Sequence, residues 1–300
     1  MYTTLIEISE LRELLQRVHL RSDPIGAHVS LIDCRFDLPR PDWGAAAYAA
    51  GHIPGAVYAH LDRDLSGPVT PQSGRHPLPS REAFAATLGR LGVDRSAQVV
   101  AYDQANGAYA ARLWWLLRWM GHSQVAVLNG GFAAWQQAGL PVSTEPVSRV
   151  ANFEWTPADA VKASAEPAVT TAELNGMVSA GDLSNARAAL VDARGADRFA
   201  GQNETIDPVA GHIPGARNHP FTGNLDASGR FLSAAELREH WLRTLAGMPP
   251  ANLIAMCGSG VTACHNLLAL EVAGLPGGRL YAGSWSEWIR DPRRPIAVGP

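Results

Sequence analysis

One of the three cysteines, Cys257, stands where a short apolar run ends and an alanine-rich segment begins. The stretch over residues 253–266 reads LIAMCGSGVTACHN, with two glycines, a serine and a threonine directly after the cysteine. Glycines permit a tight turn that aims backbone N–H groups inward, and a following helix adds its positive N-terminal end. Inward amides bind anions, and a cysteine among them is favoured as a thiolate. The pattern therefore predicts a nucleophilic cysteine that can carry sulfur as a persulfide.

The residues after the cysteine are predicted to cradle this sulfur or a bound substrate. The glycines are expected at positive φ, and the hydroxyls are expected to point at the sulfur or the substrate. The predicted cradle residues are Gly258, Ser259, Gly260, Val261 and Thr262. The alternative is a buried cysteine that serves as a small apolar side chain, but two glycines and two hydroxyls in five residues favour the cradle.

Other cysteine chemistries are tested by spacing. A cysteine phosphatase needs an arginine six residues after its nucleophile, and that position is Ala263. A thioredoxin-like pair needs a second cysteine at the position of Gly260. Cys264 and His265 are too few partners for a zinc site. We therefore expect a sulfur-accepting thiolate with no metal and no organic cofactor.

The chain also repeats itself, which indicates a duplicated domain. Four blocks recur in the same order, and Asp103 stands in the first copy where Cys257 stands in the second. The paired blocks are LIDCR (31–35) with LVDAR (190–194), GHIPGA (51–56) with GHIPGA (211–216), VVAYD (99–103) with LIAMC (253–257), and LNGGFAAW (128–135) with YAGSWSEW (281–288). The predicted domains are a silent one over 1–145, a linker over 146–166 and a catalytic one over 167–300.

Within each half, short apolar runs such as VSLID, QVVAY and LIAM alternate with segments of helical spacing. Ser9, Ser80 and Ser233 stand at the start of three such segments, which is typical of helix N-caps. Strands that alternate with helices predict an α/β fold, with a mostly parallel sheet covered by helices on both faces in each domain. Ligands of such sheets bind at the carboxyl ends of the strands, where Cys257 is predicted to lie.

The composition of the chain limits the kinds of partner and the location that we expect for it. The 300 residues are 46% hydrophobic, and 25 basic against 28 acidic residues give a formal charge of −3. Without a basic block we expect no nucleic-acid partner. Without an apolar run of about 20 residues or a signal-like start we expect no membrane segment and no secretion. Three cysteines fit a reducing compartment, so a cytoplasmic location is expected.

The CGSGVTA loop, GHIPGA before it and YAGSWSEW after it resemble the rhodanese superfamily, and more closely its tandem-domain sulfurtransferases. The resemblance covers nearly the whole chain. It implies two rhodanese-like domains, with the cysteine in the second and a silent first copy. The neutral C-G-S-G-V-T loop is similar to that of 3-mercaptopyruvate sulfurtransferases, whereas thiosulfate:cyanide enzymes usually have a basic loop.

The resemblance also implies roles for residues outside the loop. Its substrate-binding arginine falls on Arg198 in DARGADRF, with Arg194 as a second candidate. The alternative for Arg194 is a structural ion pair with Asp192 or Asp197. A second arginine that many mercaptopyruvate enzymes have before GHIPG is missing here, and Asp207 lies in that region. This departure bears on the preference for a keto acid, not on sulfur transfer.

The mercaptopyruvate family is further described with a serine–histidine–aspartate relay. Ser259 matches its serine, and His76 and Asp62 lie at matching places in the first half. A histidine oriented by a carboxylate is a competent base, although either residue could instead be structural.

Together these residues predict a ping-pong sulfurtransferase. Cys257 takes sulfur from a small donor, with 3-mercaptopyruvate favoured, and passes it to cyanide, a thiol or thioredoxin. Arg198 would bind the donor's carboxylate, and Ser259 with His76 would manage its proton. One alternative is a thiosulfate:cyanide sulfurtransferase (rhodanese). The other is a sulfur carrier or interaction module with a protein partner.

Overall fold

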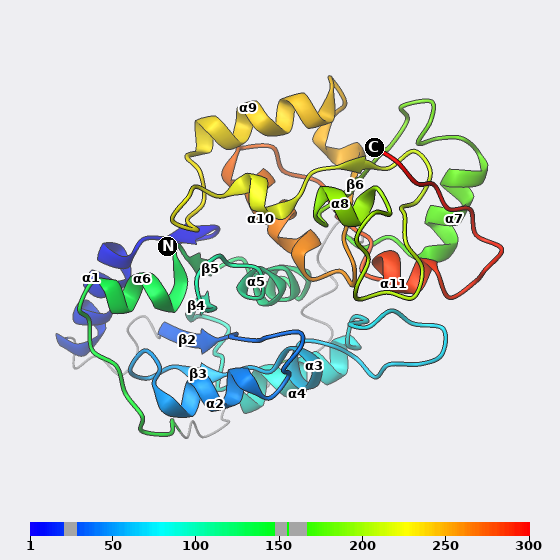
Figure 1. Cartoon of the computed structure of the whole chain (residues 1–300). Helices are drawn as coiled ribbons and strands as arrows, with labels where there is room; N and C mark the ends of the chain where they lie inside the picture. The colour runs from blue at the N-terminus through cyan, green and yellow to red at the C-terminus, as the bar shows by residue number, and fades with distance from the viewer. Residues whose placement is uncertain (21–28, 148–154, 156–166) are drawn as a thin grey trace. The chain divides into compact units, whose positions relative to one another are not determined.

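The chain forms two units, each built on one sheet, in a computed structural model that describes residues 1–20, 29–147, 155 and 167–300 (Figure 1). Unit 1 takes its described residues from 1–67, 79–164 and 227–231, and unit 2 takes them from 68–78, 165–226 and 232–300. The two halves of the sequence therefore exchange two short segments. We call residues 68–78 the first-half arm. The linker predicted over 146–166 falls almost wholly outside the described residues.

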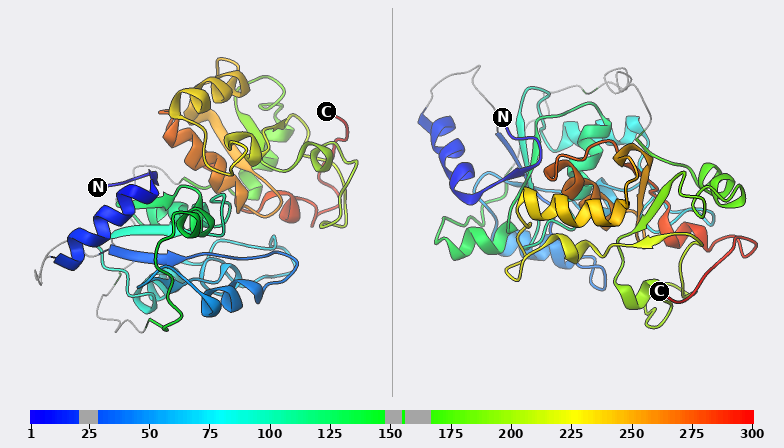
Figure 2. Two further views of the ribbon diagram at one scale, coloured as in Figure 1. Left: turned by 60° about the vertical axis from the view of Figure 1, so that its left-hand side comes forward. Right: turned by 90° about the horizontal axis from the view of Figure 1, so that it is seen from above.

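Unit 1 contains a five-stranded sheet in which all the pairings are parallel, as the alternation of strands and helices predicts. Its strands are β1 (Leu5–Ile6), β2 (Val29–Asp33), β3 (Val57–Tyr58), β4 (Gln98–Tyr102) and β5 (Val125–Leu128), in the order β1-β5-β4-β2-β3. Helices lie on both faces of this sheet (Figure 2). They are α1 (Ile8–Leu20), α2 (Trp43–Ala50), α3 (Leu61–Asp64), α4 (Arg81–Arg90), α5 (Ala110–Trp119) and α6 (Gly131–Gln137).

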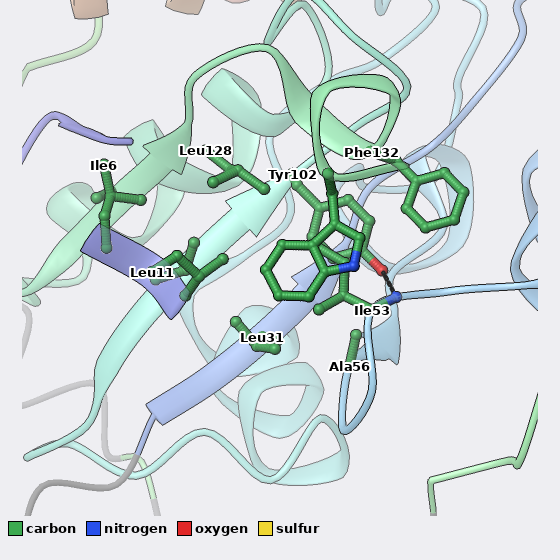
Figure 3. Packing of buried hydrophobic residues seen from close by; sticks show 11 residues of the cluster. Ile6, Leu11, Leu31, Ile53, Ala56, Tyr102, Leu128 and Phe132 are labelled. Carbon is green, nitrogen blue, oxygen red and sulfur yellow. Dashed lines mark hydrogen bonds between the residues drawn. The ribbon is translucent and has the colours of Figure 1, made fainter. Parts of the chain in front are cut away.

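Buried side chains on one side of this sheet form a core of unit 1 (Figure 3). Ile6 and Leu128 come from neighbouring parallel strands and are almost fully buried, as is Leu31 from β2. Tyr102 has a polar end in this core, and its hydroxyl accepts the backbone N–H of Ile53 at 3.2 Å. The bond ties the first GHIPGA block to β4 and satisfies a buried phenol.

Unit 2 has a four-stranded parallel sheet. Its strands are β6 (Ala189–Asp192), β7 (Arg217–Asn218), β8 (Leu253–Met256) and β9 (Arg279–Leu280), in the order β7-β6-β8-β9. Its helices are α7 (Thr171–Ser179), α8 (Ala196–Phe199), α9 (Ala234–Leu245), α10 (Thr262–Val272) and α11 (Ser284–Trp288), with 3₁₀ turns η2 (Phe221–Asn224) and η3 (Pro250–Asn252). Ile254 and Met256 of β8 pack with Trp285 and Trp288 of α11 in its core.

Two of the three predicted helix starts are confirmed. Ser80 and Ser233 are N-caps whose hydroxyls accept the backbone N–H three residues later, and Ser233 forms a capping box with Glu236. The prediction for Ser9 is wrong, because α1 begins one residue earlier, at Ile8. Glu10 performs the capping contact there, since its carboxylate accepts the backbone N–H of Glu7 at 2.8 Å.

The helices are short. The longest that the structure describes is α1, with 13 residues, whereas a bilayer-spanning helix needs about 20. Among the helices within the described residues, none has both the length and the apolar character to cross a membrane.

Candidate active site

Cys257 lies directly after β8 and five residues before the start of α10, as predicted. Its side chain is buried, and its Sγ accepts the backbone N–H of Gly260 at 3.1 Å. The backbone N–H of Cys257 donates to Ser284 Oγ at 3.0 Å, which fixes the first residue of the loop against α11. The sulfur therefore sits at the end of a central strand with one backbone donor already aimed at it.

The two loop glycines are required for different reasons. Gly260 has φ +79°, and a Cβ there would lie 2.4 Å from the carbonyl oxygen of Ala282. The expectation of positive φ at Gly258 is wrong. A Cβ on Gly258 would instead lie 2.9 Å from Nη2 of Arg75, so its missing side chain makes room for a guanidinium beside the cysteine.

The carbonyl groups at the start of the loop are held by α11. The oxygen of Cys257 accepts the backbone N–H of Trp285 at 3.0 Å, and that of Gly258 accepts Ser286 N–H at 2.9 Å. The structure records no partner for the N–H groups of Gly258, Ser259 and Val261 within the described residues. Backbone donors thus remain available around the sulfur, which is what a nest for an anion requires. Val261 occupies the N-cap position of α10 without a side-chain capping bond, and Thr262 is the first residue of the helix.

Ser259 and His76 come together, although 183 positions separate them in sequence. Nδ1 of His76 lies 2.7 Å from Ser259 Oγ, and both side chains are buried. The contact forms because the first-half arm, which carries His76, belongs to unit 2. Asp62, the predicted third member, lies in the first turn of α3 in unit 1, so its part in the relay stays a prediction.

Arg194 forms the structural ion pair that was one of its two alternatives. Its Nη2 lies 2.7 Å from Asp192 Oδ2 and donates to the carbonyl oxygen of Gly211 at 2.8 Å. Its Nε also contacts Asp192, and its Nη1 lies 3.4 Å from Glu204. The side chain is 1% exposed, so little of the guanidinium is left for a substrate.

Arg198 lies closer to the cysteine loop but is also engaged. Its Nε and Nη2 bind Glu204 at 2.9–3.2 Å, and its Nη2 lies 3.2 Å from Asp207. Burial raises the pKa of Glu204, but hydrogen bonds from the Asp207 backbone N–H and from Arg198 outweigh it and hold the pKa below its usual value. Burial raises the pKa of Asp207, against the opposing effect of Arg75. No hydrogen bond of Arg198 Nη1 is recorded within the described residues.

Arg75 is the residue that sequence reasoning missed. It precedes His76 in the first-half arm, and its Nη1 donates to Asp207. Asp207, which lies where a second arginine was expected, thus holds an arginine from the other half of the sequence. We call the six residues Asp192, Arg194, Glu204, Arg198, Asp207 and Arg75 the arginine–carboxylate network. The only sequence signal for Arg75 was its position next to His76.

The three cysteines form no disulfide, and the described residues hold no cluster suited to a metal ion. Cys34, Cys257 and Cys264 are all buried and unpaired by disulfides. Cys264, in the first turn of α10, donates its S–H to the carbonyl oxygen of Gly260 at 3.3 Å. In the part of the chain that the structure describes, no three His, Cys, Asp or Glu side chains gather to hold a metal ion.

Comparison with known proteins gives a consistent picture. The model of the rhodanese-like domain matches residues 9–138 and again 170–291. The chain is 49% identical over 272 residues to a probable 3-mercaptopyruvate sulfurtransferase of Pseudomonas aeruginosa, covering 90% of this chain and 92% of that one. It is 38% identical to the putative thiosulfate sulfurtransferase SseB of Mycobacterium tuberculosis, covering 98% and 97%. The crystal structure of SseA from Escherichia coli, titled as a 3-mercaptopyruvate sulfotransferase, superposes with a TM-score of 0.75 at 32% identity, covering 95% of this chain and all of that one.

Proposed function

The chain belongs to the rhodanese family of sulfurtransferases, and we propose that it moves sulfur from 3-mercaptopyruvate through a persulfide on Cys257 to a thiol or cyanide. The observation that carries this proposal is the Cys257 loop, with a buried sulfur at a strand end and backbone donors around it. Such a loop stabilises a thiolate and, after transfer, the anionic outer sulfur of a persulfide.

In the first half-reaction the Cys257 thiolate attacks the donor's sulfur. A sulfur–sulfur bond forms, the donor's carbon–sulfur bond breaks, and the electron pair of that bond stays on carbon as the enolate of pyruvate. The thiol proton of the donor must leave its sulfur, and a proton must reach the enolate carbon. The sum converts thiolate and 3-mercaptopyruvate into persulfide and pyruvate, with no external oxidant or reductant.

The contact between Ser259 and His76 supports a route for this proton. At 2.7 Å the two side chains share a hydrogen bond, so proton transfer between them needs no large movement. Ser259 lies two residues after the nucleophile, within the loop that would hold the donor. Asp62 is proposed to orient His76, as in the related relay, and this part of the proposal rests on the sequence resemblance alone.

The charge near the loop supports a donor with a single carboxylate. The arginine–carboxylate network contains three arginines and three acids, so its formal charges cancel before a substrate binds. A thiosulfate dianion would bring two charges to a site without a net positive charge. A keto acid brings one carboxylate, which one guanidinium can bind by paired hydrogen bonds.

Thiosulfate remains the second candidate donor. One observation favours it: Arg75 adds a cation beside the loop that the sequence did not predict, and its Nη2 would lie 2.9 Å from a Cβ on Gly258. In that reaction the thiolate displaces sulfite from sulfur, and no proton transfer is needed.

In the second half-reaction an acceptor attacks the outer sulfur and releases the Cys257 thiolate. Cyanide, a low-molecular-weight thiol or thioredoxin would each serve. A cytoplasmic location is part of this proposal, because a reducing compartment keeps three cysteines as thiols.

The deciding experiment measures kcat/KM for 3-mercaptopyruvate and for thiosulfate side by side with the full chain, using cyanide as acceptor. We expect the higher value for 3-mercaptopyruvate. Donor treatment without acceptor should add about 32 Da, one sulfur atom, to the peptide that contains Cys257. Sulfur found on Cys34 or Cys264 instead would contradict the assignment of the nucleophile, and a higher kcat/KM for thiosulfate would contradict the assignment of the donor.

A further inference from the structure

Two side chains of α11 hold the first-half arm, and the helix and the arm both belong to unit 2. The backbone N–H of Gly74 donates to a carboxylate oxygen of Glu287 at 3.3 Å. The backbone N–H of the next residue, Arg75, donates to Ser286 Oγ at 3.1 Å, and Ser286 is buried. These contacts fix the backbone of the arm directly before the histidine that reaches the cysteine loop.

The carboxylate of Glu287 has a partner at each of its oxygens. One oxygen accepts the backbone N–H of Gly74, and the other accepts the hydroxyl of Thr171, the first residue of α7. The hydroxyls of Thr171 and Tyr281 lie 2.9 Å apart, so the Tyr281 hydroxyl donates to Thr171, whose own proton is already used. Thr171 therefore holds Glu287 in one orientation, in which its second oxygen faces the arm.

The arm approaches α11 so closely that only glycine fits at position 74. A Cβ on Gly74 would lie 2.6 Å from the carbonyl oxygen of Gly283 and 2.8 Å from Ser286 Oγ. Just after the helix, Nε of Arg290 donates to the carbonyl oxygen of Ser73 at 3.2 Å. The missing side chain at position 74 thus brings the arm's backbone within hydrogen-bonding reach of the helix.

The equivalent helix of unit 1 lacks these side chains. The paired blocks LNGGFAAW and YAGSWSEW place two alanines, Ala133 and Ala134, at the positions of the serine and the glutamate that hold the arm. The backbone contact of the two helices is the same: Ala133 donates its N–H to the loop after β4 at 2.8 Å, and Ser286 donates its N–H to the cysteine loop at 2.9 Å. Holding the loop is therefore common to both helices, whereas the two side chains that hold the arm belong to the helix of unit 2.

We propose that Glu287 and Ser286 are positioning residues that hold the first-half arm so that His76 meets Ser259. The inference rests on the proposed function and adds the residues on which its proton route depends. Ser286 links the two sides directly, because its backbone N–H binds Gly258 of the cysteine loop and its Oγ binds the arm. The contact between His76 and Ser259 is 2.7 Å long, so a displacement of the arm by about 1 Å breaks it.

The first test measures kcat for both donors in Glu287→Ala, Glu287→Gln and Glu236→Ala of the full chain. Glu236→Ala is the matched control, since Glu236 also accepts a backbone N–H and a hydroxyl in unit 2, but within the capping box of α9. We expect Glu287→Ala to lower kcat for 3-mercaptopyruvate roughly 5- to 20-fold and thiosulfate turnover less than threefold, because only the first reaction needs the proton. Glu287→Gln keeps an oxygen for Gly74 and an NH₂ group for Thr171, so it should stay within threefold of wild type. Glu236→Ala should stay within twofold for both donors.

The second test asks whether the loss passes through His76. In the His76→Gln background, Glu287→Ala should lower kcat less than twofold further, because the contact that the arm positions is already absent. Gly74→Ala approaches the same contact from the arm, since its Cβ must move the arm away from α11, and it should reproduce the losses of Glu287→Ala. The inference is overturned if the losses of Glu287→Ala and His76→Gln multiply in the double variant. It is also overturned if Gly74→Ala and Glu287→Ala both leave kcat for 3-mercaptopyruvate within twofold of wild type.

Hydrogen exchange provides a readout that needs no donor. In Glu287→Ala the peptide that covers residues 70–78 should exchange at least tenfold faster than in wild type, while the peptide that contains Cys257 should stay within twofold. Unchanged exchange in the arm would overturn the inference. Equal acceleration of both peptides would overturn it as well, because it would show a general loosening of unit 2. A wild type that does not turn over 3-mercaptopyruvate would contradict the proposed function instead, and the exchange rates would still decide whether α11 holds the arm.

Discussion

The loops after β4 in unit 1 and after β8 in unit 2 hold the side chain of their first residue in different ways. In unit 1 Asp103 follows β4, and its carboxylate accepts the backbone N–H groups of the next loop at 2.9–3.2 Å; these donors belong to Ala105, Gly107, Tyr109 and Ala110. In unit 2 Cys257 follows β8, and within the described residues its sulfur accepts one backbone N–H, that of Gly260. Unit 1 fills its nest with the carboxylate of Asp103, whereas the loop of unit 2 keeps backbone donors that the proposed persulfide would use.

The aspartate–arginine pairs of the two units add a second contrast. Arg35 binds Asp33 and the carbonyl oxygen of Gly51 in unit 1, just as Arg194 binds Asp192 and that of Gly211 in unit 2. A contact that recurs in both units fastens the GHIPGA block to the sheet and needs no catalytic explanation. Among the residues that the structure describes, the pair of unit 2 alone continues through Glu204 toward the cysteine loop. What the duplicated units share is structural, and what only unit 2 has is available for chemistry.

The largest expected effect comes from removing the nucleophile. Cys257→Ser should abolish transfer from both donors, because a hydroxyl cannot carry a sulfane sulfur. Turnover and persulfide formation measure this directly. Cys34→Ala is the matched control, since Ala193 occupies the equivalent position in unit 2 and both are buried. Residual persulfide-dependent turnover in Cys257→Ser would show that another residue is the nucleophile. The proposed functional difference between the two loops would then be wrong.

The next largest expected effect comes from removing the hydroxyl that is proposed to transfer the donor's proton. Ser259→Ala should lower kcat for 3-mercaptopyruvate about 100-fold, the lower end for loss of a general acid–base contribution. Thiosulfate turnover should change less than threefold, since it needs no proton transfer. His76→Gln should reproduce this split if the two residues act through their hydrogen bond. Equal losses with both donors would show that the pair maintains the structure of the loop and does not transfer the proton.

Much of the fold follows from local sequence. The strands β2 and β4 cover the runs VSLID and QVVAY residue for residue, because short apolar runs rich in β-branched residues are typical of buried strands. The turn at Cys257 was likewise predictable, since glycine at 260 and the start of α10 are encoded beside it.

The rest of the site depends on contacts that local patterns do not encode. Arg75 reaches the cysteine loop because residues 68–78 belong to unit 2. No periodicity or spacing in the sequence predicts that this segment of the first half joins unit 2. For the same reason the sequence suggested that Asp207 leaves this region without a second arginine. In the structure Asp207 instead binds an arginine, Arg75. Gly258 was expected to supply a backbone angle but supplies space for a guanidinium.

The nest in unit 1 gives a third prediction. Asp103→Ala should lower the free energy of unfolding by about 2–3 kcal/mol, because it leaves buried N–H donors without their charged acceptor. Sulfur transfer at 25 °C should stay within tenfold of wild type if unit 1 is silent. Denaturant unfolding and kcat/KM measure the two effects. Asp103→Asn is the matched variant: it keeps the shape but turns an NH₂ group toward N–H donors, so a comparable loss is expected. A loss of turnover without a loss of stability would mean that unit 1 takes part in catalysis.

A histidine marks another difference between the units. His219 follows β7 and donates its backbone N–H to Asp192 O at 2.9 Å, as Ala59 does to Asp33 O in unit 1. Its ring stacks on Trp241 with centroids 3.9 Å apart. Burial lowers the pKa of His219 from 6.5 to about 4, with a hydrogen bond from its ring to Asn224 opposing the shift. Unit 2 therefore contains a buried neutral imidazole where unit 1 has a methyl group.

The smallest expected effect is a loss of stability in mild acid, which we attribute to the protonation of His219. The unfolded chain takes up a proton near pH 6.5, whereas folded His219 resists it down to about pH 4. His219 therefore contributes its full stabilisation above pH 6.5, and this contribution is lost as the pH falls from 6.5 to 4. The loss in the free energy of unfolding is about 2 kcal/mol at pH 5. Burial also lowers the pKa of His122 in unit 1, so wild type is compared with His219→Gln, which cannot titrate there. Denaturant midpoints at pH 7.5 and pH 5 should fall further apart in the wild type than in the variant. Equal pH dependence in the two proteins would show that His219 is protonated in the fold and that the units do not differ in this respect.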